Sequence, residues 1–403
     1  MQMKFILFLV AFSSFHSIAQ PIRGKVIDSA SGKPLLNASV FISNTSIGTL
    51  TDNQGEFTLT RFPSNSFDLV ISYVGYNVIS FKANSPSDVL FVIKLTPKKD
   101  ELREVTVTPY EKNGWDKWGF LFENNFLGIT PLSRQCEILN KKKIKFQYSS
   151  AKEMVYAFCD EPIIVINKAL GYKIKYALVN FRFSLKDNYR IILGYPLFAD
   201  LPGSAKRQKR WKQSRHDTYE GSLLQFMRAL FNNSTTETGF EIRQLVRKPN
   251  MEKERIKMRL NIQSPIQFID YSSLHLPVDT INYFNSILKQ SDHIDLLYKT
   301  LLEPKNIVSK SDSATAVLHF LQYLHITYTK KRPPIEYLQE NRDAVYSSFS
   351  VSEITIMDGH SIYIEDSGNF HDPIDFTISG YWAWWENLGS LIPLDYYPEN
   401  EKR

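Results

Sequence analysis

Between residues 22 and 95 the chain is built from short runs rich in β-branched and aromatic residues, and a turn signal ends each run. About seven such runs follow one another, and none has the 3.6-residue period of an amphipathic helix. Strands this short and this regularly spaced predict an all-β sandwich. Val26, Val40, Phe57 and Leu69 are expected to face its core.

The segment Asp52-Asn53-Gln54-Gly55 separates two of these runs. Asp52 can bond the backbone two residues further on, and Gly55 can adopt the positive φ of a tight turn. The EF-hand spacing of acidic residues and its closing glutamate are missing, which argues against a calcium loop. We therefore expect a turn here rather than an ion site.

Five short motifs stand in one order within this part of the chain. They are Gly24-x-Val26-x-Asp28, Gly32-x-Pro34-Leu35, Ala38-x-Val40, Gly48-Thr49-x-Thr51-Asp52-x-x-Gly55-x-Phe57 and Ser72-Tyr73-Val74-Gly75-Tyr76. Together they resemble the carboxypeptidase regulatory-like domain, a transthyretin-like (prealbumin-like) sandwich that is common in envelope proteins of Bacteroidetes. The resemblance implies an accessory module rather than a catalytic domain.

A zinc carboxypeptidase needs a His-x-x-Glu pair, a further histidine and a catalytic glutamate. No histidine after residue 19 has a glutamate three positions later, and no His-Glu-x-x-His occurs. These histidines are His216, His275, His293, His319, His325, His360 and His371. The resemblance is therefore to the accessory module, and no catalytic, cofactor-binding or metal-binding residue is assigned.

Residues 1–19 have the three-part pattern of a cleavable signal peptide. Lys4 precedes an apolar run, and Ser17 and Ala19 occupy the −3 and −1 positions of a small-residue cleavage site. The run is shorter than the roughly 20 residues of a membrane span, and the alternative is a buried N-terminal strand. We expect export, a mature chain that starts near Gln20, and a periplasmic, outer-membrane or cell-surface location. No cysteine follows the cleavage site, so a lipoprotein is not expected.

The chain has a formal net charge of +6, which says little about its partners. Its only cysteines are Cys136 and Cys159. Because an exported protein meets an oxidising compartment, we expect these two to form a disulfide. The alternative is a pair of buried thiols that fill space in a core.

A polar, proline-containing segment follows the sandwich at Thr96-Pro97-Lys98-Lys99-Asp100. Such a composition is typical of a domain boundary. We expect a signal peptide over 1–19, the sandwich over 20–97, a linker over 98–112 and an α+β domain of unknown function over 113–403.

The part after the linker has many β-type runs and few helical ones, which predicts the α+β class. Trp115, Trp118, Phe122 and Phe126 recur at helical spacing, and residues 205–231 are also expected to be helical. Strands are expected at 144–148, 154–158, 163–166, 174–183, 189–193, 240–246, 255–262, 317–328, 350–357, 361–365 and 374–378. Some stretches resemble a region found beside such modules in other Bacteroidetes envelope proteins, but this resemblance implies no activity.

A basic segment spans residues 206–215. Its charged members are Lys206, Arg207, Lys209, Arg210, Lys212 and Arg215, with Trp211 among them and no acidic residue. Such a patch is also found in nucleic-acid binders, but the expected export argues against that partner. A solvated helix face is one interpretation, and contact with an anionic envelope surface is the other.

The densest aromatic cluster consists of Tyr381, Trp382, Trp384 and Trp385. Exposed tryptophans stack on sugar faces or anchor protein interfaces, whereas buried ones fill a core. The sequence leaves both alternatives open.

The sequence favours a non-catalytic envelope protein that binds a partner protein or a glycan, without a cofactor, a nucleic acid or a membrane span. The basic segment and the aromatic cluster are its candidate binding surface. The alternative is an envelope hydrolase with its site in the α+β domain. His360, His371 and Asp372 flank a predicted hairpin and could converge, although turn positions are the simpler interpretation.

Overall fold

The structure is a computed structural model that describes residues 21–63, 66–83, 90–98, 109–262, 276–312, 314–341, 348–371 and 373–399. The expected signal peptide and most of the expected linker lie outside these residues. Within the described ranges, no helix combines the length and the apolar composition that crossing a membrane requires.

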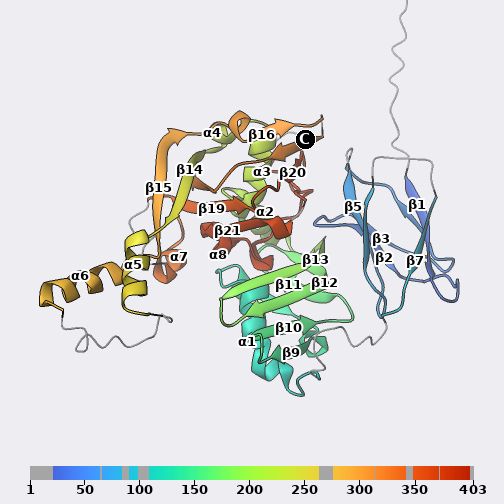
Figure 1. Cartoon of the computed structure of the whole chain (residues 1–403). Coiled ribbons are helices and arrows are strands. Elements are labelled where there is room, and N and C mark those ends of the chain that lie inside the picture. Colours follow the sequence, from blue (N-terminus) through green and yellow to red (C-terminus); the bar gives the residue numbers. More distant parts are fainter. Residues whose placement is uncertain are drawn as a thin grey trace, which may run out of the picture.

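The N-terminal part is a seven-stranded sandwich (Figure 1). One sheet has the order β4-β1-β7, and its strands are β1 (Ile22–Asp28), β4 (Glu56–Leu59) and β7 (Phe91–Leu95). The other has the order β3-β2-β5-β6, with β2 (Ser39–Ile42), β3 (Gly48–Leu50), β5 (Phe67–Ser72) and β6 (Ile79–Ala83). Val26, Val40, Phe57 and Leu69 are all buried in the shared core, so the predicted sandwich and its core are confirmed.

The predicted turn at Asp52–Gly55 is also present. The Asp52 carboxylate accepts hydrogen bonds from the backbone N–H groups of Gln54 (2.9 Å) and Glu56 (2.8 Å). Gly55 has a φ of +74°, and a Cβ there would lie 2.5 Å from the carbonyl oxygen of Val26. This position therefore requires glycine for both its dihedral angle and its space.

The middle of the chain folds into a six-stranded sheet covered by one helix. Its elements are α1 (Gly114–Phe126), β8 (Cys136–Ile138), β9 (Lys145–Ser149), β10 (Met154–Phe158), β11 (Ile163–Asn167), β12 (Tyr172–Ser184) and β13 (Tyr189–Asp200). One edge of β12 pairs with β13, and the other pairs first with β11 and then with β10. The expected aromatic helix is α1: its Phe122 and Phe126 pack 4.7 Å from Phe181 and 4.9 Å from Tyr176, between ring centroids.

The C-terminal part has two further sheets around a second α+β core. The five-stranded sheet β15-β14-β18-β19-β21 contains β14 (Phe240–Pro249), β15 (His293–Leu301), β18 (Tyr323–Tyr328), β19 (Ser350–Ile356) and β21 (Phe376–Gly380). The three-stranded sheet β16-β17-β20 contains β16 (Val308–Lys310), β17 (Thr315–Leu318) and β20 (Ile362–Glu365). The helices are α2 (Ala205–Tyr219), α3 (Leu223–Phe231), α4 (Thr235–Thr238), α5 (Met251–Arg259), α6 (Val278–Leu288), α7 (Ile335–Glu340) and α8 (Tyr381–Trp385). Most of α3 is buried in the core formed by both sheets and α8.

Three expectations about secondary structure need correction. The strand expected over 317–328 is two strands of different sheets, β17 and β18, and the chain turns between them, where Gln322 has a φ of +63°. The helix expected over 205–231 is two helices, α2 and α3, because the chain turns at Gly221 with a φ of +78°. The strand expected over 255–262 is wrong, because this region contains most of α5. The side chain of Asn250 caps that helix by accepting a hydrogen bond from the Lys253 N–H (3.1 Å), and α5 buries only Ile256.

The expected disulfide is also wrong, since Cys136 and Cys159 are free thiols. Cys136 lies in β8 and donates to the carbonyl of Leu132, whereas Cys159 follows β10 and donates to that of Lys143. Strands β11 and β12 lie between β8 and β10 in the sheet, which keeps the two sulfurs apart. Burial raises the pKa of both thiols, that of Cys136 to about 12, so both behave as small apolar fillers.

Candidate binding surfaces

The aromatic cluster in α8 belongs to the core and not to a surface. The exposed fractions of Tyr381, Trp382, Trp384 and Trp385 are 6%, 2%, 8% and 8%. The Trp382 indole N–H donates to the carbonyl of Gly221 (2.8 Å), and that of Trp384 donates to the Glu340 carboxylate (2.7 Å). A stacked or binding role needs an open ring face, so the expected aromatic binding surface is corrected to core packing.

The basic segment forms the exposed side of α2. Lys206, Arg207, Lys209 and Arg210 are exposed, while Trp211 is buried and donates to the carbonyl of Lys168 (2.9 Å). Burial of this ring fixes the other face of the helix against the middle sheet. Lys212 of the same segment is also exposed, and contact of these cations with an anionic envelope surface stays a prediction.

Arg215 is separate from that surface. Its guanidinium lies 3.8 Å from the centre of the Tyr172 ring and donates to the carbonyl of Leu170 (2.8 Å) and to Asp200 (2.7 Å). Only 12% of its side chain is exposed. Arg215 therefore holds α2 against the middle sheet, and we remove it from the expected binding surface.

The sandwich docks onto the middle sheet through the loop between β2 and β3. The backbone N–H of Phe198 donates to the carbonyl of Thr45 (2.9 Å), and that of Asn44 donates to Pro196 (3.0 Å). A parallel bridge joins Thr45 and Leu197, so this loop lies along β13 as a short extra strand.

Residues 394–396, which we call the C-terminal segment, reach the same loop. The Leu394 N–H donates to the carbonyl of Asn44 (2.7 Å), and the Asp395 carboxylate accepts from the backbone N–H of Ser46 (2.9 Å). The buried side chain of Arg228 donates to the carbonyls of Leu394 (2.8 Å) and Tyr396 (2.9 Å). This C-terminal segment thus connects the sandwich with α3.

A second contact joins the sandwich to β20 through the carboxylate of Glu365, whose side chain is only 4% exposed. Ser66 of the sandwich donates to it at 3.1 Å, and the Lys82 ammonium lies 3.7 Å away. His371 Nε2 lies 2.6 Å from the same carboxylate. Burial alone would raise the pKa of Glu365, but the hydrogen bond and charge of His371 outweigh it and lower that pKa, while the pKa of His371 is raised.

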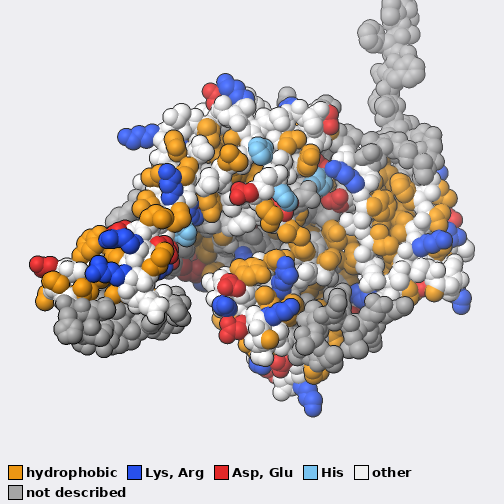
Figure 2. Space-filling model, viewed as in Figure 1, with side chains coloured by type: hydrophobic (Ala, Val, Ile, Leu, Met, Phe, Trp, Pro, Cys, Tyr) orange, Lys and Arg blue, Asp and Glu red, His pale blue; other side chains and the backbone are white. Residues whose placement is uncertain are grey.

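Between the sandwich and the middle sheet lies a cleft of about 630 Å³, which we call the interdomain cleft. Leu36, Leu50 and Val74 of the sandwich line one side and are 44%, 50% and 58% exposed. The middle sheet contributes Pro162, Ile164, Ala177 and Leu197. Figure 2 shows hydrophobic side chains gathered over the sandwich on its visible side. The accessible surface of the lining is mainly apolar, and its contact with water is unfavourable in free energy.

The interdomain cleft also has polar lining residues, which are Asn37, Ser39, Ser72, Asn140, Glu161 and Lys175, together with the hydroxyl of Tyr73. Asn140 is held in place, because its amide donates to Glu161 (2.9 Å) and its amide oxygen accepts from the Ile164 N–H (2.9 Å). Neither histidine nor cysteine is among its lining residues. The sequence could not reveal this cleft, because Val74 and Leu197 meet there from distant parts of the chain.

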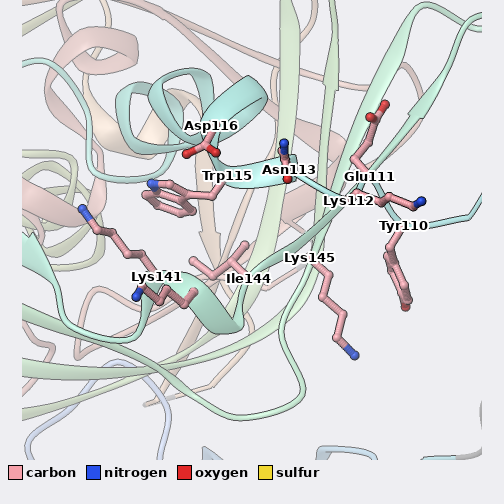
Figure 3. A pocket seen from close by; sticks show the side chains of 11 residues that line it. Tyr110, Glu111, Lys112, Asn113, Trp115, Asp116, Lys141, Ile144 and Lys145 are labelled. Carbon is pink, nitrogen blue, oxygen red and sulfur yellow. The ribbon is translucent and has the colours of Figure 1, made fainter.

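A second cavity of about 610 Å³ lies beside the start of α1. In Figure 3, Lys141 and Trp115 lie on one side of it, with Tyr110 and Lys112 on the other. Glu111 and Asp116 also line it, so its charge is mixed. The labelled lysine side chains do not point toward one common point in this view. The labelled lysine side chains therefore do not form a convergent positive site for an anionic ligand.

The histidines near the expected hairpin do not converge. His360 Nδ1 lies 2.6 Å from the Asp375 carboxylate, whereas His371 pairs with Glu365. Asp372 lies outside the described residues. In the part of the chain that the structure describes, no group of three or more His, Cys, Asp or Glu residues is arranged to hold a metal ion.

Glu386, which follows α8, is an acidic group that the sequence did not single out. Its carboxylate accepts a hydrogen bond from the backbone N–H of Leu223, at the start of α3 (2.8 Å). Desolvation of the carboxyl raises its pKa to about 7, although the Leu223 hydrogen bond acts in the opposite direction. Its contact is with a helix start and not with an open pocket.

Comparisons with known proteins agree with the N-terminal fold. Residues 22–107 match the CarboxypepD_reg-like domain, so the chain carries a carboxypeptidase regulatory-like domain, as its motifs predict. No curated protein matches the sequence.

Two solved structures of Bacteroides proteins have remote similarity to the chain. A DUF3823 family protein from Bacteroides ovatus ATCC 8483 is 9% identical, with 45% of this chain and 81% of that chain covered and a TM-score of 0.17. A putative membrane-associated protein of unknown function from Bacteroides fragilis NCTC 9343 is 11% identical, with 85% and 92% covered and a TM-score of 0.15. At such values neither similarity supports an argument about the function of this chain.

Proposed function

We propose that this chain is a non-catalytic binding protein of the cell envelope, and that the interdomain cleft takes an apolar segment of a partner protein. The single observation that supports this most is the aliphatic lining of the cleft, with exposed Leu36, Leu50 and Val74. Burying such side chains against a partner gives roughly 25 cal/mol per Å² of apolar area removed from water.

A protein partner fits this lining better than a glycan. Sugars are held by flat aromatic faces together with many hydrogen-bonding groups. The tryptophans of α8 are in the core. Two aromatic residues line the cleft, but Phe41 is only 2% exposed and Tyr73 is half-buried, so the exposed apolar side chains of the cleft are chiefly leucine and valine. Acid–base chemistry needs titratable groups that converge, and the titratable lining residues of the cleft are Glu161, Lys175 and Tyr73, with no histidine or cysteine among them. The hydrolase alternative therefore has less support than binding.

The envelope location rests on the expected signal peptide and on the carboxypeptidase regulatory-like domain at residues 22–107. Fractionation of the native organism and N-terminal sequencing test it. A start near Gln20 in an envelope fraction is expected, whereas an intact Met1 in the cytosolic fraction would contradict the location.

The binding role is tested by photo-cross-linking in intact cells, with a photoreactive amino acid placed at Leu50 or at Val74. The matched control is Leu321, which is 64% exposed in the turn between β17 and β18 and does not line the cleft. We expect a discrete protein adduct from positions 50 and 74 and none from 321. Adding Leu36→Asp should remove the adduct without changing the melting temperature.

Other outcomes would decide against the proposal. Equal adducts from all three positions would show that the cleft has no special role. Adducts with polysaccharide alone would replace the protein partner by a glycan. Hydrolysis of an envelope substrate by the purified protein would overturn the non-catalytic assignment.

A further inference from the structure

Strands β14 and β15 form an arm that extends from the body, with α5 and α6 at its end (Figure 1). The arm and the sandwich lie on opposite sides of the molecule in this view. All nine residues of β15 are exposed. The large apolar ones are 42–54% exposed, and they are Ile294, Leu296, Leu297, Tyr298 and Leu301. Figure 2 shows hydrophobic side chains along this arm among its charged ones.

Strand β15 is the last strand of its sheet, and among the described residues it pairs with β14 alone. The Asn250 N–H donates to the carbonyl of Asp292 (2.8 Å), which makes these two residues a hydrogen-bonded pair. Because such pairs alternate along an antiparallel ladder, His293, Asp295 and Leu297 direct their N–H and C=O groups away from β14.

A register shift extends the available edge. Leu297 pairs with Leu245, but Leu301 pairs with Arg243, so residues 298–300 lie opposite the single residue Gln244. Residues of such a bulge are left out of the ladder with β14. The ladder with β14 therefore does not occupy these three residues.

Unpaired edges usually carry devices that prevent strand addition, such as a proline or several lysines. Residues 293–301 contain no proline and one lysine, Lys299. Asp295 stays ionised beside Arg247, which donates to both of its carboxylate oxygens (2.8 and 2.7 Å), so its charge repels an added strand less than a lone carboxylate would and can still face a cation. A long and largely apolar edge of this kind is a template for another strand.

We propose that two copies of this chain form a dimer by antiparallel pairing of β15 with β15, around a two-fold axis at Leu297. In this register Asp295 of each copy faces Lys299 of the other, and Leu296 faces Tyr298. Opposite charges and apolar–aromatic pairs directly across strands are both stabilising. A register centred on Asp295 would instead place the two aspartates face to face. The charges of the strand thus complement those of a second copy, which identifies the occupant.

Cysteine cross-linking tests the register. Leu297→Cys places two thiols at the axis, with Cα atoms about 5.5 Å apart, a distance that a disulfide can span. Thr300→Cys is the matched control, because it is exposed on the same strand but would lie roughly 20 Å from its counterpart. We expect a covalent dimer from Leu297→Cys and none from Thr300→Cys or from the wild type, whose two native cysteines control for other disulfides.

Charge substitution tests the same surface without a covalent bond. Lys299→Glu places like charges opposite each other twice per dimer, so we expect the dimer dissociation constant to rise at least about tenfold, while Lys299→Arg leaves it unchanged. Sedimentation equilibrium of the mature protein measures this constant. A wild-type monomer at about 100 μM, equal cross-linking from position 300, or no response to Lys299→Glu would each overturn the proposal.

Discussion

Glu365 and Glu386 are two acidic side chains in partly desolvated regions, but their surroundings act on them in opposite directions. At the boundary between the sandwich and β20, His371 and Lys82 approach Glu365, and its pKa is lowered. At the junction of α3 and α8, Glu386 accepts one hydrogen bond from a backbone N–H, and its pKa is raised to about 7. Desolvation without a cation favours the neutral acid, whereas a nearby imidazolium favours the carboxylate.

The largest effect on stability is expected at the α3–α8 junction, when a packed aromatic side chain is removed there and Glu386 is left in place. Trp382→Ala deletes a ring that is 2% exposed and lies 5.0 Å from the ring of Phe226, between centroids. We expect a loss of about 3–5 kcal/mol in the free energy of unfolding, measured by denaturant titration. Leu321→Ala, at an exposed position, is the control and should change little. A loss below about 1 kcal/mol for Trp382→Ala would show that α8 is not part of the core.

Glu365→Gln should have the next largest effect, because it leaves His371 without its carboxylate and weakens the contact with Ser66. Breaking a mostly buried charged contact of this kind should lower stability by about 2–3 kcal/mol. Glu56→Gln, at an exposed position in β4, controls for loss of one negative charge. Equal effects of the two substitutions in thermal unfolding would refute a special role for Glu365.

Glu386→Gln should act in the opposite direction above neutral pH. The pKa of Glu386 is higher in the folded state than its ordinary value of 4.5, so the folded state binds more protons between pH 4.5 and about 7. The Glu386 contribution to stability therefore decreases as pH rises through this window. We expect the glutamine variant to be more stable than the wild type by about 1–2 kcal/mol at pH 8 and nearly equal at pH 4.5. A variant that is less stable at pH 8 would contradict this sign.

The smallest effect is expected from His371, whose pKa is raised chiefly by its hydrogen bond with Glu365. Its charged form stabilises the folded state below the ordinary histidine pKa of about 6.5, and this contribution is lost as pH rises through the folded-state pKa. Glu365 has a lowered pKa, so its own contribution is lost as pH falls through that pKa. His371→Gln should remove the alkaline part of this dependence, worth about 1 kcal/mol, in melting temperatures measured from pH 5 to pH 9. If the melting temperature of His371→Gln depended on pH as that of the wild type does, the pairing of His371 with Glu365 would not contribute to stability.

Local patterns in the sequence were sufficient for the sandwich and for α1. Alternation marked Val26 and Phe57 as core residues, and the spacing of Phe122 and Phe126 marked a helix. The same approach failed at residues 255–262, where Ile256 and Met258 alternate as in a strand while the Asn250 cap starts a helix. In so short a segment the alternation of apolar residues predicts a strand and the capping residue predicts a helix, and here the capping residue gives the correct prediction.

The binding surfaces were less accessible to sequence reasoning. Composition alone cannot tell whether Trp382 faces solvent or packs against Phe226. A cluster of tryptophans in the sequence is compatible with an exposed binding surface and with a buried core. The interdomain cleft and the contact of Glu365 with Ser66 join residues that are distant in sequence. Such juxtapositions depend on how sheets dock, and no local pattern records that.

The C-terminal segment has a consequence for the order in which the molecule is assembled. Asn44 and Ser46 leave the ribosome well before their partners Leu394 and Asp395, since 349 positions separate Ser46 from Asp395. Arg228 likewise can reach the carbonyls of Leu394 and Tyr396, which lie 166 and 168 positions later in the chain, only after the residues between them have been synthesised. The three cores can each begin to form during synthesis, but the bonds that join the sandwich to α3 through this segment close only afterwards. A chain that lacks this segment would therefore lose the bonds that join the sandwich to α3, and the buried guanidinium of Arg228 would be left without two of its carbonyl partners.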